Sequence, residues 1–233
     1  HLQEKYQRDY VFFDEYMEEC LYSEYGFFNT TKIRSSKDGD FLTSPEVSNY
    51  FGLFISNWID SNKIKNNVLE VGPGTGSLAS QIKNYSQKNL FLIEKSETAF
   101  LTLKEEEFNV FKTLDLVPSE NIDLIYMNEV LDNISCSIGV YKENKWFEKV
   151  IKIDSESLSY NLAPIREDSL SWIKQNNIEP LDDFEVEIQR NITTYLGDIV
   201  AQFKPKFLLI IDYGYEAHER SGKPYKSLIR TYK

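Results

Sequence analysis

Cysteine and histidine are scarce in this sequence, which has two of each among its 233 residues. Cys20 and Cys136 are too few for a disulfide framework or for a zinc site built on thiolates. We therefore expect no metal centre and a reducing compartment, for which the cytoplasm is the plain assignment. Long apolar runs are also missing, because the longest, Phe207–Ile211, is far shorter than the roughly 20 residues of a membrane-spanning helix. We accordingly expect no membrane partner.

Positive charge is in deficit, with 26 Lys and Arg residues against 37 Asp and Glu residues and a formal net charge of -11. Nucleic-acid binders need a face rich in lysine and arginine to neutralise phosphates, so we expect no nucleic-acid partner. Hydrophobic residues, by contrast, make up 41% of the chain and aromatic residues 14%. This is enough apolar material for one sizeable core, and it predicts one main domain with a smaller insertion.

The first 66 residues have a helical pattern. Apolar residues recur at spacings of three and four from Phe12 to Leu21, which predicts an amphipathic helix. A second helix is expected to begin in the T-S-P-E segment at 43–46, where a hydroxyl side chain before proline suits a helix start, and to run through Trp58. We therefore predict an N-terminal helical cap segment over residues 1–66.

From Val68 onward, short apolar runs alternate with helical stretches, the pattern of βαβ units around a parallel sheet. This predicts a doubly wound, Rossmann-like α/β domain over residues 67–233. Between 139 and 162 the rhythm breaks into an antiparallel meander with a turn at Glu143 and Asn144, and we interpret residues from about 139 to about 190 as an insertion. The predicted strands are 68–71, 90–93, 122–127 and 207–211, and the predicted helices are 78–85, 97–107 and 192–203.

Residues 70–76 carry the motif E-V-G-P-G-T-G directly after the first of these strands. Its glycines let the backbone turn sharply and approach a ligand where doubly wound domains hold a nucleotide. The G-x-G-x-G spacing differs from the dinucleotide G-x-G-x-x-G motif, which leaves room for a pyrophosphate that S-adenosylmethionine (SAM) lacks. The alternative is a tight turn without a ligand. The cofactor-binding residues expected here are Glu70, Gly72, Pro73, Gly74 and Gly76.

Glu94 follows the second strand, about 20 residues beyond the glycines, where doubly wound nucleotide sites place an acid on the ribose hydroxyls. The alternative is a solvated charge at a strand end. Leu114 and Asp115 lie in the next strand-to-helix region, the usual neighbourhood of the adenine ring. We expect all three residues to contact the cofactor.

The segment N-E-V-L-D at 128–132 follows the strand at 122–127, at the sheet edge where open α/β domains bind ligands. Glu129 and Asp132 could share one side of a helical turn and hold or deprotonate a substrate amine or guanidinium, with Asn128 beside the cofactor. The alternative is that these acids have no catalytic role and only stabilise the N-terminus of a helix through its dipole. His218, the only histidine besides His1, is a candidate general base or simply a solvated loop residue.

The motifs together resemble the MidA family of SAM-dependent methyltransferases. The matching segments are 16–28, 39–48, 70–76, 128–132 and 211–219. The resemblance implies a class I methyltransferase fold, SAM as cofactor and methylation of a protein arginine, in the mitochondrial matrix if the source is eukaryotic. It also implies that the segment G-D-F-L-T-S-P-E folds over the cofactor, which adds Thr43, Ser44 and Pro45 to the expected SAM site.

Two departures from the family affect what the resemblance implies. After N-E-V-L-D the family continues with a small residue, an apolar residue and proline, whereas residues 133–135 here are N-I-S, so the substrate-side loop can differ. The final antiparallel hairpin of a class I methyltransferase also has no evident copy in this chain.

Three functions stay open on the sequence. The first is a protein arginine methyltransferase that uses Glu129 and Asp132. The second is an O-methyltransferase for a small-molecule or carrier-bound hydroxyl, with His218 as base, which fits a domain cut from a larger biosynthetic enzyme. The third is a catalytically silent, SAM-binding assembly factor that grips a partner through aromatic side chains.

Overall fold

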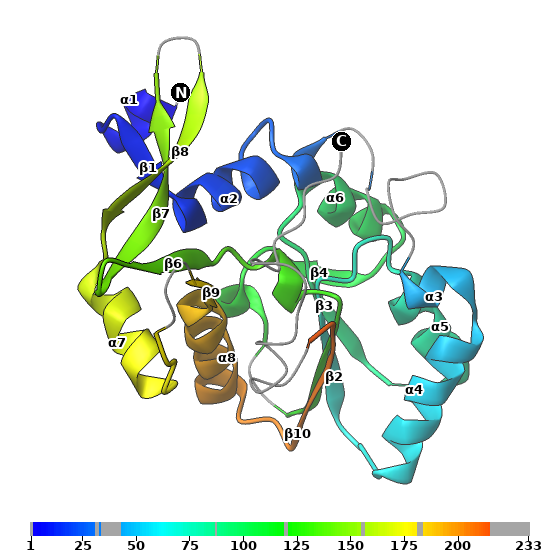
Figure 1. The fold of residues 1–233 in the computed structure, drawn as a ribbon. Helices are drawn as coiled ribbons and strands as arrows, with labels where there is room; N and C mark the ends of the chain where they lie inside the picture. The colour runs from blue at the N-terminus through cyan, green and yellow to red at the C-terminus, as the bar shows by residue number, and fades with distance from the viewer. Residues whose placement is uncertain are drawn as a thin grey trace. The chain divides into compact units, whose positions relative to one another are not determined.

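The computed structural model describes residues 2–30, 33, 43–86, 88–118, 121–154, 157–180 and 184–214 (Figure 1). These residues divide into two compact units. Residues 20–133 and 195–213 form the parallel-sheet unit, and residues 2–19, 134–194 and Gly214 form the antiparallel-sheet unit.

The parallel-sheet unit is built on five parallel strands in the order β10-β5-β2-β3-β4. Numbered along the chain and read from the β4 edge, this order is 3-2-1-4-5, so the winding direction reverses between β2 and β5. In doubly wound sheets the ligand crevice lies outside the carboxyl ends of the strands at that reversal. The strands are β2 (Asn67–Val71), β3 (Leu90–Ile93), β4 (Asn109–Phe111), β5 (Ile122–Asn128) and β10 (Phe207–Ile211).

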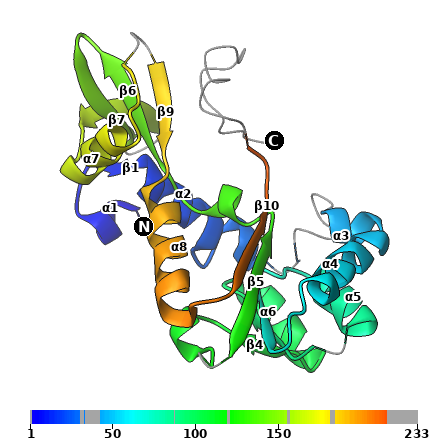
Figure 2. The same cartoon turned by 90° about the horizontal axis from the view of Figure 1, so that it is seen from below.

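Helices cover both faces of this sheet (Figure 2) because its strands are apolar on both sides. On one face Val68 packs with Ile59 and Ile82 from two neighbouring helices. On the other face Leu69 packs with Ile199 of the last helix. Each side chain so buried contributes roughly 1.5 to 3 kcal/mol. The helices of the first face are α4 (Tyr50–Ser61), α5 (Ser77–Tyr85) and α6 (Glu97–Glu105), and the second face is covered by α8 (Arg190–Phe203).

The antiparallel-sheet unit has the strand order β1-β7-β6-β9, with β8 paired to β7. The turn between β6 and β7 places Glu143 and Asn144 at φ values of 52° and 59°, the left-handed pair that a tight hairpin needs. Its strands are β1 (Tyr10–Phe12), β6 (Ser137–Lys142), β7 (Lys145–Ile153), β8 (Leu158–Pro164) and β9 (Phe184–Ile188), and its helices are α1 (Leu2–Tyr6), the first part of α2 (Phe13–Tyr22) and α7 (Glu167–Gln175).

A buried ion-pair network holds this second unit together. The Arg166 guanidinium donates at 2.8 Å to Glu148, which is fully buried, and at 2.8 Å to Asp14. Arg190 donates at 2.7 Å to the other oxygen of Asp14. Removal of one partner would leave a buried charge uncompensated, so the network fixes the relative positions of α2, β7 and α7.

The structure confirms the four predicted strands, the three predicted helices of the α/β part and the antiparallel meander. It corrects the second N-terminal helix, which is two helices, α3 (Ser44–Val47) and α4, because Ser48 is extended and its Oγ accepts the Tyr50 N–H at 3.2 Å. The short strands β1, β4 and β9 were not predicted. The division into a cap at 1–66 and a domain at 67–233 stays a prediction.

Candidate active site

The glycine motif forms a left-handed turn between β2 and α5. Gly72, Gly74 and Gly76 have φ values of 65°, 56° and 75°, which side-chain-bearing residues rarely adopt. A β-carbon on Gly72 would lie 2.8 Å from the Val130 side chain, and one on Gly76 would lie 2.6 Å from Leu103. The turn therefore tolerates no side chain at these two positions and presents bare backbone.

Glu70 lies beneath this turn rather than beside it. Its side chain is 3% exposed and accepts a hydrogen bond from the Tyr126 hydroxyl at 2.6 Å across the β2–β5 pairing. Burial, together with the charge of Glu94, raises the pKa of Glu70 to about 8, although the Tyr126 hydrogen bond opposes the shift. The Tyr126 hydrogen bond ties β2 to β5 under the turn, and the predicted contact of Glu70 with the cofactor stays a prediction. Pro73, also predicted, is buried within the turn.

Glu94 links the end of β3 to the glycine turn. Its carboxylate accepts the Gly74 N–H at 3.1 Å and the Ser96 N–H at 2.8 Å, and it is 7% exposed. Burial raises its pKa, although the backbone hydrogen bonds from Ser96, Gly74 and Lys95 and the charge of Lys112 act in the opposite direction. A carboxylate has about four acceptor positions, and the Lys95 backbone N–H uses a third, so about one remains for a further donor. Glu94 is therefore not the solvated strand-end charge of the alternative interpretation.

An aromatic segment packs over the β3–α6 turn. The 3-10 turn Phe27–Asn29 follows α2, and the Ser96 hydroxyl donates to the Phe28 carbonyl at 2.6 Å. The Tyr22 ring stacks on Phe28 at 5.4 Å, and the Lys95 ammonium lies 3.7 Å from the centre of the Tyr22 ring. These contacts place a matched family segment beside Glu94. The sequence reasoning gave this segment no role.

The predicted adenine residues follow β4 in the 3-10 turn Leu114–Leu116. Leu114 packs in the core on the α8 face, and its carbonyl accepts a hydrogen bond from Gln202 at 2.7 Å. Asp115 is exposed. Their role toward an adenine ring stays a prediction.

The N-E-V-L-D segment leaves the carboxyl end of β5. Glu129 has a φ of 54°, and its N–H donates to the Ile211 carbonyl at 2.8 Å. The segment then forms the 3-10 turn Leu131–Asn133. The prediction that Glu129 and Asp132 share a regular helical turn is therefore wrong, because Glu129 is left-handed and precedes the turn. Asn128 Oδ1 is buried, without a hydrogen-bond partner in the described parts of the chain.

Asp212, which the sequence reasoning did not select, organises this segment. Its Oδ2 accepts the N–H groups of Val130 at 3.2 Å and Leu131 at 2.8 Å. Partial burial and the charges of Asp212 and Glu129 raise the pKa of Asp132 to about 6. Three carboxylates thus lie within electrostatic reach of one another at the carboxyl edge of β5 and β10. The available signal was the position of Asp212 directly after a predicted strand.

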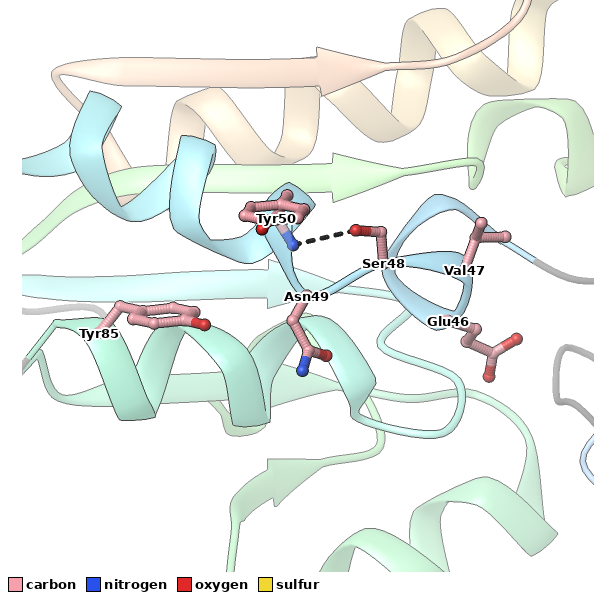
Figure 3. Close-up of a pocket in the computed structure, with 6 residues that line it drawn as sticks. All are labelled: Glu46, Val47, Ser48, Asn49, Tyr50 and Tyr85. Atoms are coloured by element: carbon pink, nitrogen blue, oxygen red, sulfur yellow. Dashed lines mark hydrogen bonds between the residues drawn. The ribbon is translucent and has the colours of Figure 1, made fainter.

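The T-S-P-E segment lies against the glycine turn and α5. Thr43 caps α3, Ser44 begins it, and Pro45 is buried. Gln81 of α5 donates to the Pro45 carbonyl at 2.6 Å, and the Thr75 hydroxyl donates to Glu46 at 2.9 Å. The structure therefore joins this segment to α5 through Pro45 and to the glycine turn through Glu46, which sequence reasoning missed. The roles of Thr43, Ser44 and Pro45 toward SAM stay predictions. Outside this contact Glu46 lines a cavity of about 530 Å³ with Val47, Ser48, Asn49, Tyr50 and Tyr85 (Figure 3).

Two further expectations concern a base and a metal. His218 lies outside the described residues, so its predicted role as a base stays a prediction. Within the described residues no group of His, Cys, Asp and Glu is arranged to hold a metal ion. In the same residues no helix is long and apolar enough to cross a membrane.

Residues 52–233 match a family described as S-adenosyl-L-methionine-dependent methyltransferases. The chain is 28% identical over 247 residues to the mitochondrial protein arginine methyltransferase NDUFAF7 of Bos taurus, and 27% identical over 251 residues to that of Mus musculus. Each alignment covers 87% of this chain but only 55% and 56% of the relative. The chain therefore spans about half the length of these curated relatives.

Two solved structures from Burkholderia thailandensis share the fold. One, bound to S-adenosyl-homocysteine, has a TM-score of 0.76 at 20% identity and covers 94% of this chain and 62% of that protein. The other, a native crystal structure, has a TM-score of 0.71 at 20% identity, with 97% and 62% covered. The predicted class I methyltransferase fold is thereby confirmed.

Proposed function

Because this chain belongs to the family of SAM-dependent methyltransferases, we propose that it transfers a methyl group from SAM to an arginine side chain of a protein substrate. The cluster of Glu129, Asp132 and Asp212 beside the glycine turn is the observation that carries the choice of acceptor. The names of the bovine and mouse relatives, both protein arginine methyltransferases, support it.

The described residues fit SAM by their chemistry. SAM offers ribose hydroxyls, an α-ammonium group and a positive sulfonium, which are hydrogen-bond donors or positive charges. The site offers complementary acceptors: Glu94 with a spare acceptor position, and buried unpartnered oxygens on Asn128 and Glu46. Gly74, in a left-handed conformation with a φ of 56°, has no side chain to hold a ligand away from the backbone of the turn. When bound, SAM supplies an electrophilic methyl group on its sulfonium sulfur.

The carboxylate cluster suits a guanidinium better than a hydroxyl. A guanidinium is a planar cation with five N–H donors, and carboxylates bind it through paired, charge-assisted hydrogen bonds. Glu129 and Asp132 would hold the arginine, and its charge would offset the desolvation and the carboxylate repulsion that raise the pKa of Asp132. With a pKa of about 6, Asp132 is mostly ionised at neutral pH and can accept the proton that the methylated nitrogen releases.

Val130 connects the segment proposed to bind arginine with the turn proposed to bind SAM. It lies between Glu129 and Asp132, and its side chain fills the space that a β-carbon on Gly72 would occupy. The acceptor-binding segment is therefore in van der Waals contact with the turn proposed to hold SAM. This contact supports in-line transfer, because alignment of the reactants contributes up to roughly 7 to 11 kcal/mol in well-oriented reactions.

The location of the protein belongs to the same proposal. The sequence leads us to expect the cytoplasm, or the mitochondrial matrix in a eukaryote. The bovine and mouse relatives are named as mitochondrial proteins, which supports the mitochondrial location.

Methyl transfer from labelled SAM to a protein extract, with products identified by mass spectrometry, tests the acceptor. We expect methylarginine, and at saturating SAM we expect its formation to fall by at least tenfold in Glu129→Gln and Asp132→Asn. Glu167→Gln removes an exposed acid of α7 in the antiparallel-sheet unit and should leave the rate unchanged. A methyl ether in place of methylarginine would overturn the arginine proposal, and SAM binding without any turnover would overturn the enzymatic one.

A further inference from the structure

One carboxylate oxygen of Glu46 accepts a hydrogen bond, and the other has no hydrogen-bond partner among the described residues. Its Oε1 accepts the Thr75 hydroxyl at 2.9 Å, in the middle of the glycine turn. Its Oε2 is buried and has no hydrogen-bond partner in the part of the chain that the structure describes. A buried, negatively charged acceptor without a donor is costly, so such an atom points to a missing ligand.

The position of this carboxylate is fixed by the elements around it. Gln81 of α5 donates to the Pro45 carbonyl of α3 and accepts the Gly52 N–H of α4 at 2.9 Å, so one side chain of α5 holds the residue before Glu46 and the helix that follows α3. Figure 3 shows the Glu46 carboxylate directed away from Asn49 and Tyr85, which line the far part of the cavity. The hydrogen bond of the Glu46 carboxylate is therefore made to the glycine turn, through Thr75, although Glu46 also lines the cavity.

We propose that Glu46 Oε2 accepts a hydrogen bond from the α-ammonium group of SAM, an inference that rests on the proposed function. A carboxylate repels the ligand carboxylate, and the ribose hydroxyls have an acceptor in Glu94, which contacts Gly74. The ammonium group is the remaining charged donor of the ligand, with three N–H bonds and a full positive charge. Glu46 thus selects ligands that carry a free amino group.

Calorimetric titration with two ligands tests this assignment on the full chain. The ligands are S-adenosyl-homocysteine and its analogue that lacks only the amino group. Glu46→Gln preserves the size of the side chain and an acceptor for Thr75, but it removes the charge. We expect it to weaken binding of S-adenosyl-homocysteine by about 10- to 100-fold, the range for a charge-assisted hydrogen bond, and to change binding of the deaminated analogue by less than about twofold.

Glu94→Gln is the matched control, because it should weaken both ligands equally. Binding of the deaminated analogue to Glu46→Gln also shows that the variant is folded. Equal losses for both ligands in Glu46→Gln, or no loss for either, would overturn this inference and leave the proposed function standing. If the unchanged protein bound neither ligand, the proposed function would fall and this inference with it.

Discussion

Replacement of Glu70 by glutamine should make the protein more stable at neutral pH. Glu70 is 3% exposed, and its pKa rises from the ordinary 4.5 to about 8. An acid whose pKa is higher in the folded than in the unfolded protein binds its proton more tightly when folded. The free energy of unfolding therefore falls as pH rises from the unfolded pKa toward the folded one. Glu70→Gln removes this titration and keeps an acceptor for Tyr126.

The expected magnitude follows from the size of the shift. One pKa unit corresponds to about 1.4 kcal/mol, so between about pH 5 and about pH 7.5 the Glu70 titration lowers the stability of the unchanged protein by about 3 kcal/mol. The free energy of unfolding of Glu70→Gln should lack this loss. Affinity for S-adenosyl-homocysteine should change by less than about twofold, because glutamine keeps the size of the buried side chain and its acceptor for Tyr126.

The free energy of unfolding of the parallel-sheet unit can be measured by urea titration, with Trp58 fluorescence as the signal. Trp58 packs on Phe207 in the parallel-sheet unit, and the other two tryptophans, Trp146 and Trp172, can be replaced by phenylalanine to isolate its signal. Glu105→Gln, which removes an exposed acid of α6, is the control. If Glu70→Gln lost stability with pH as steeply as the unchanged protein, the argument from burial would be refuted.

Three further predictions concern the site. Gly74→Val should abolish binding of S-adenosyl-homocysteine in calorimetry, because a side chain enters the bare turn, and a folded variant with unchanged affinity would contradict the assignment. Glu94→Ala should cost about 1.5 to 3 kcal/mol of binding free energy in the same assay, and a loss within error would remove Glu94 from the ribose site. Methyl transfer should decline as pH falls through about 6, where Asp132 is protonated, and Asp212→Asn should move this decline to lower pH, because it removes one of the charges that raise the pKa of Asp132. An unmoved profile in Asp212→Asn would show that the carboxylates are not coupled.

The sheet could be predicted from sequence because its long strands are distinct in composition. Continuous apolar runs such as Ile122–Asn128 lie between turn-forming residues, and burial on both faces explains why they do not alternate. Strands β1 and β4 have three residues each, too few to show any period. The family, the SAM cofactor and the fold class were also predicted, and the comparisons confirm them.

The site could be predicted only where its residues are adjacent in sequence. The glycine turn and the acids of N-E-V-L-D are local motifs, whereas Asp212 is 81 residues away from the Leu131 N–H that it accepts. Glu46 likewise reaches Thr75 across 29 residues. Periodicity also could not reveal that Glu129 adopts a left-handed conformation, since this follows from its hydrogen bond to Ile211.

The contacts of Gln81 restrict which amino acids can occupy its position. Its amide nitrogen donates to the Pro45 carbonyl while its amide oxygen accepts the Gly52 N–H. Glutamate would place an acceptor against the carbonyl, and lysine would place a donor against the N–H, so only a side chain with both polarities satisfies the two neighbours. A β-carbon at Gly52 would in turn lie 2.3 Å from that of Gln81. Positions 52 and 81 therefore form a matched pair, in which a substitution at either one requires a compensating change at the other.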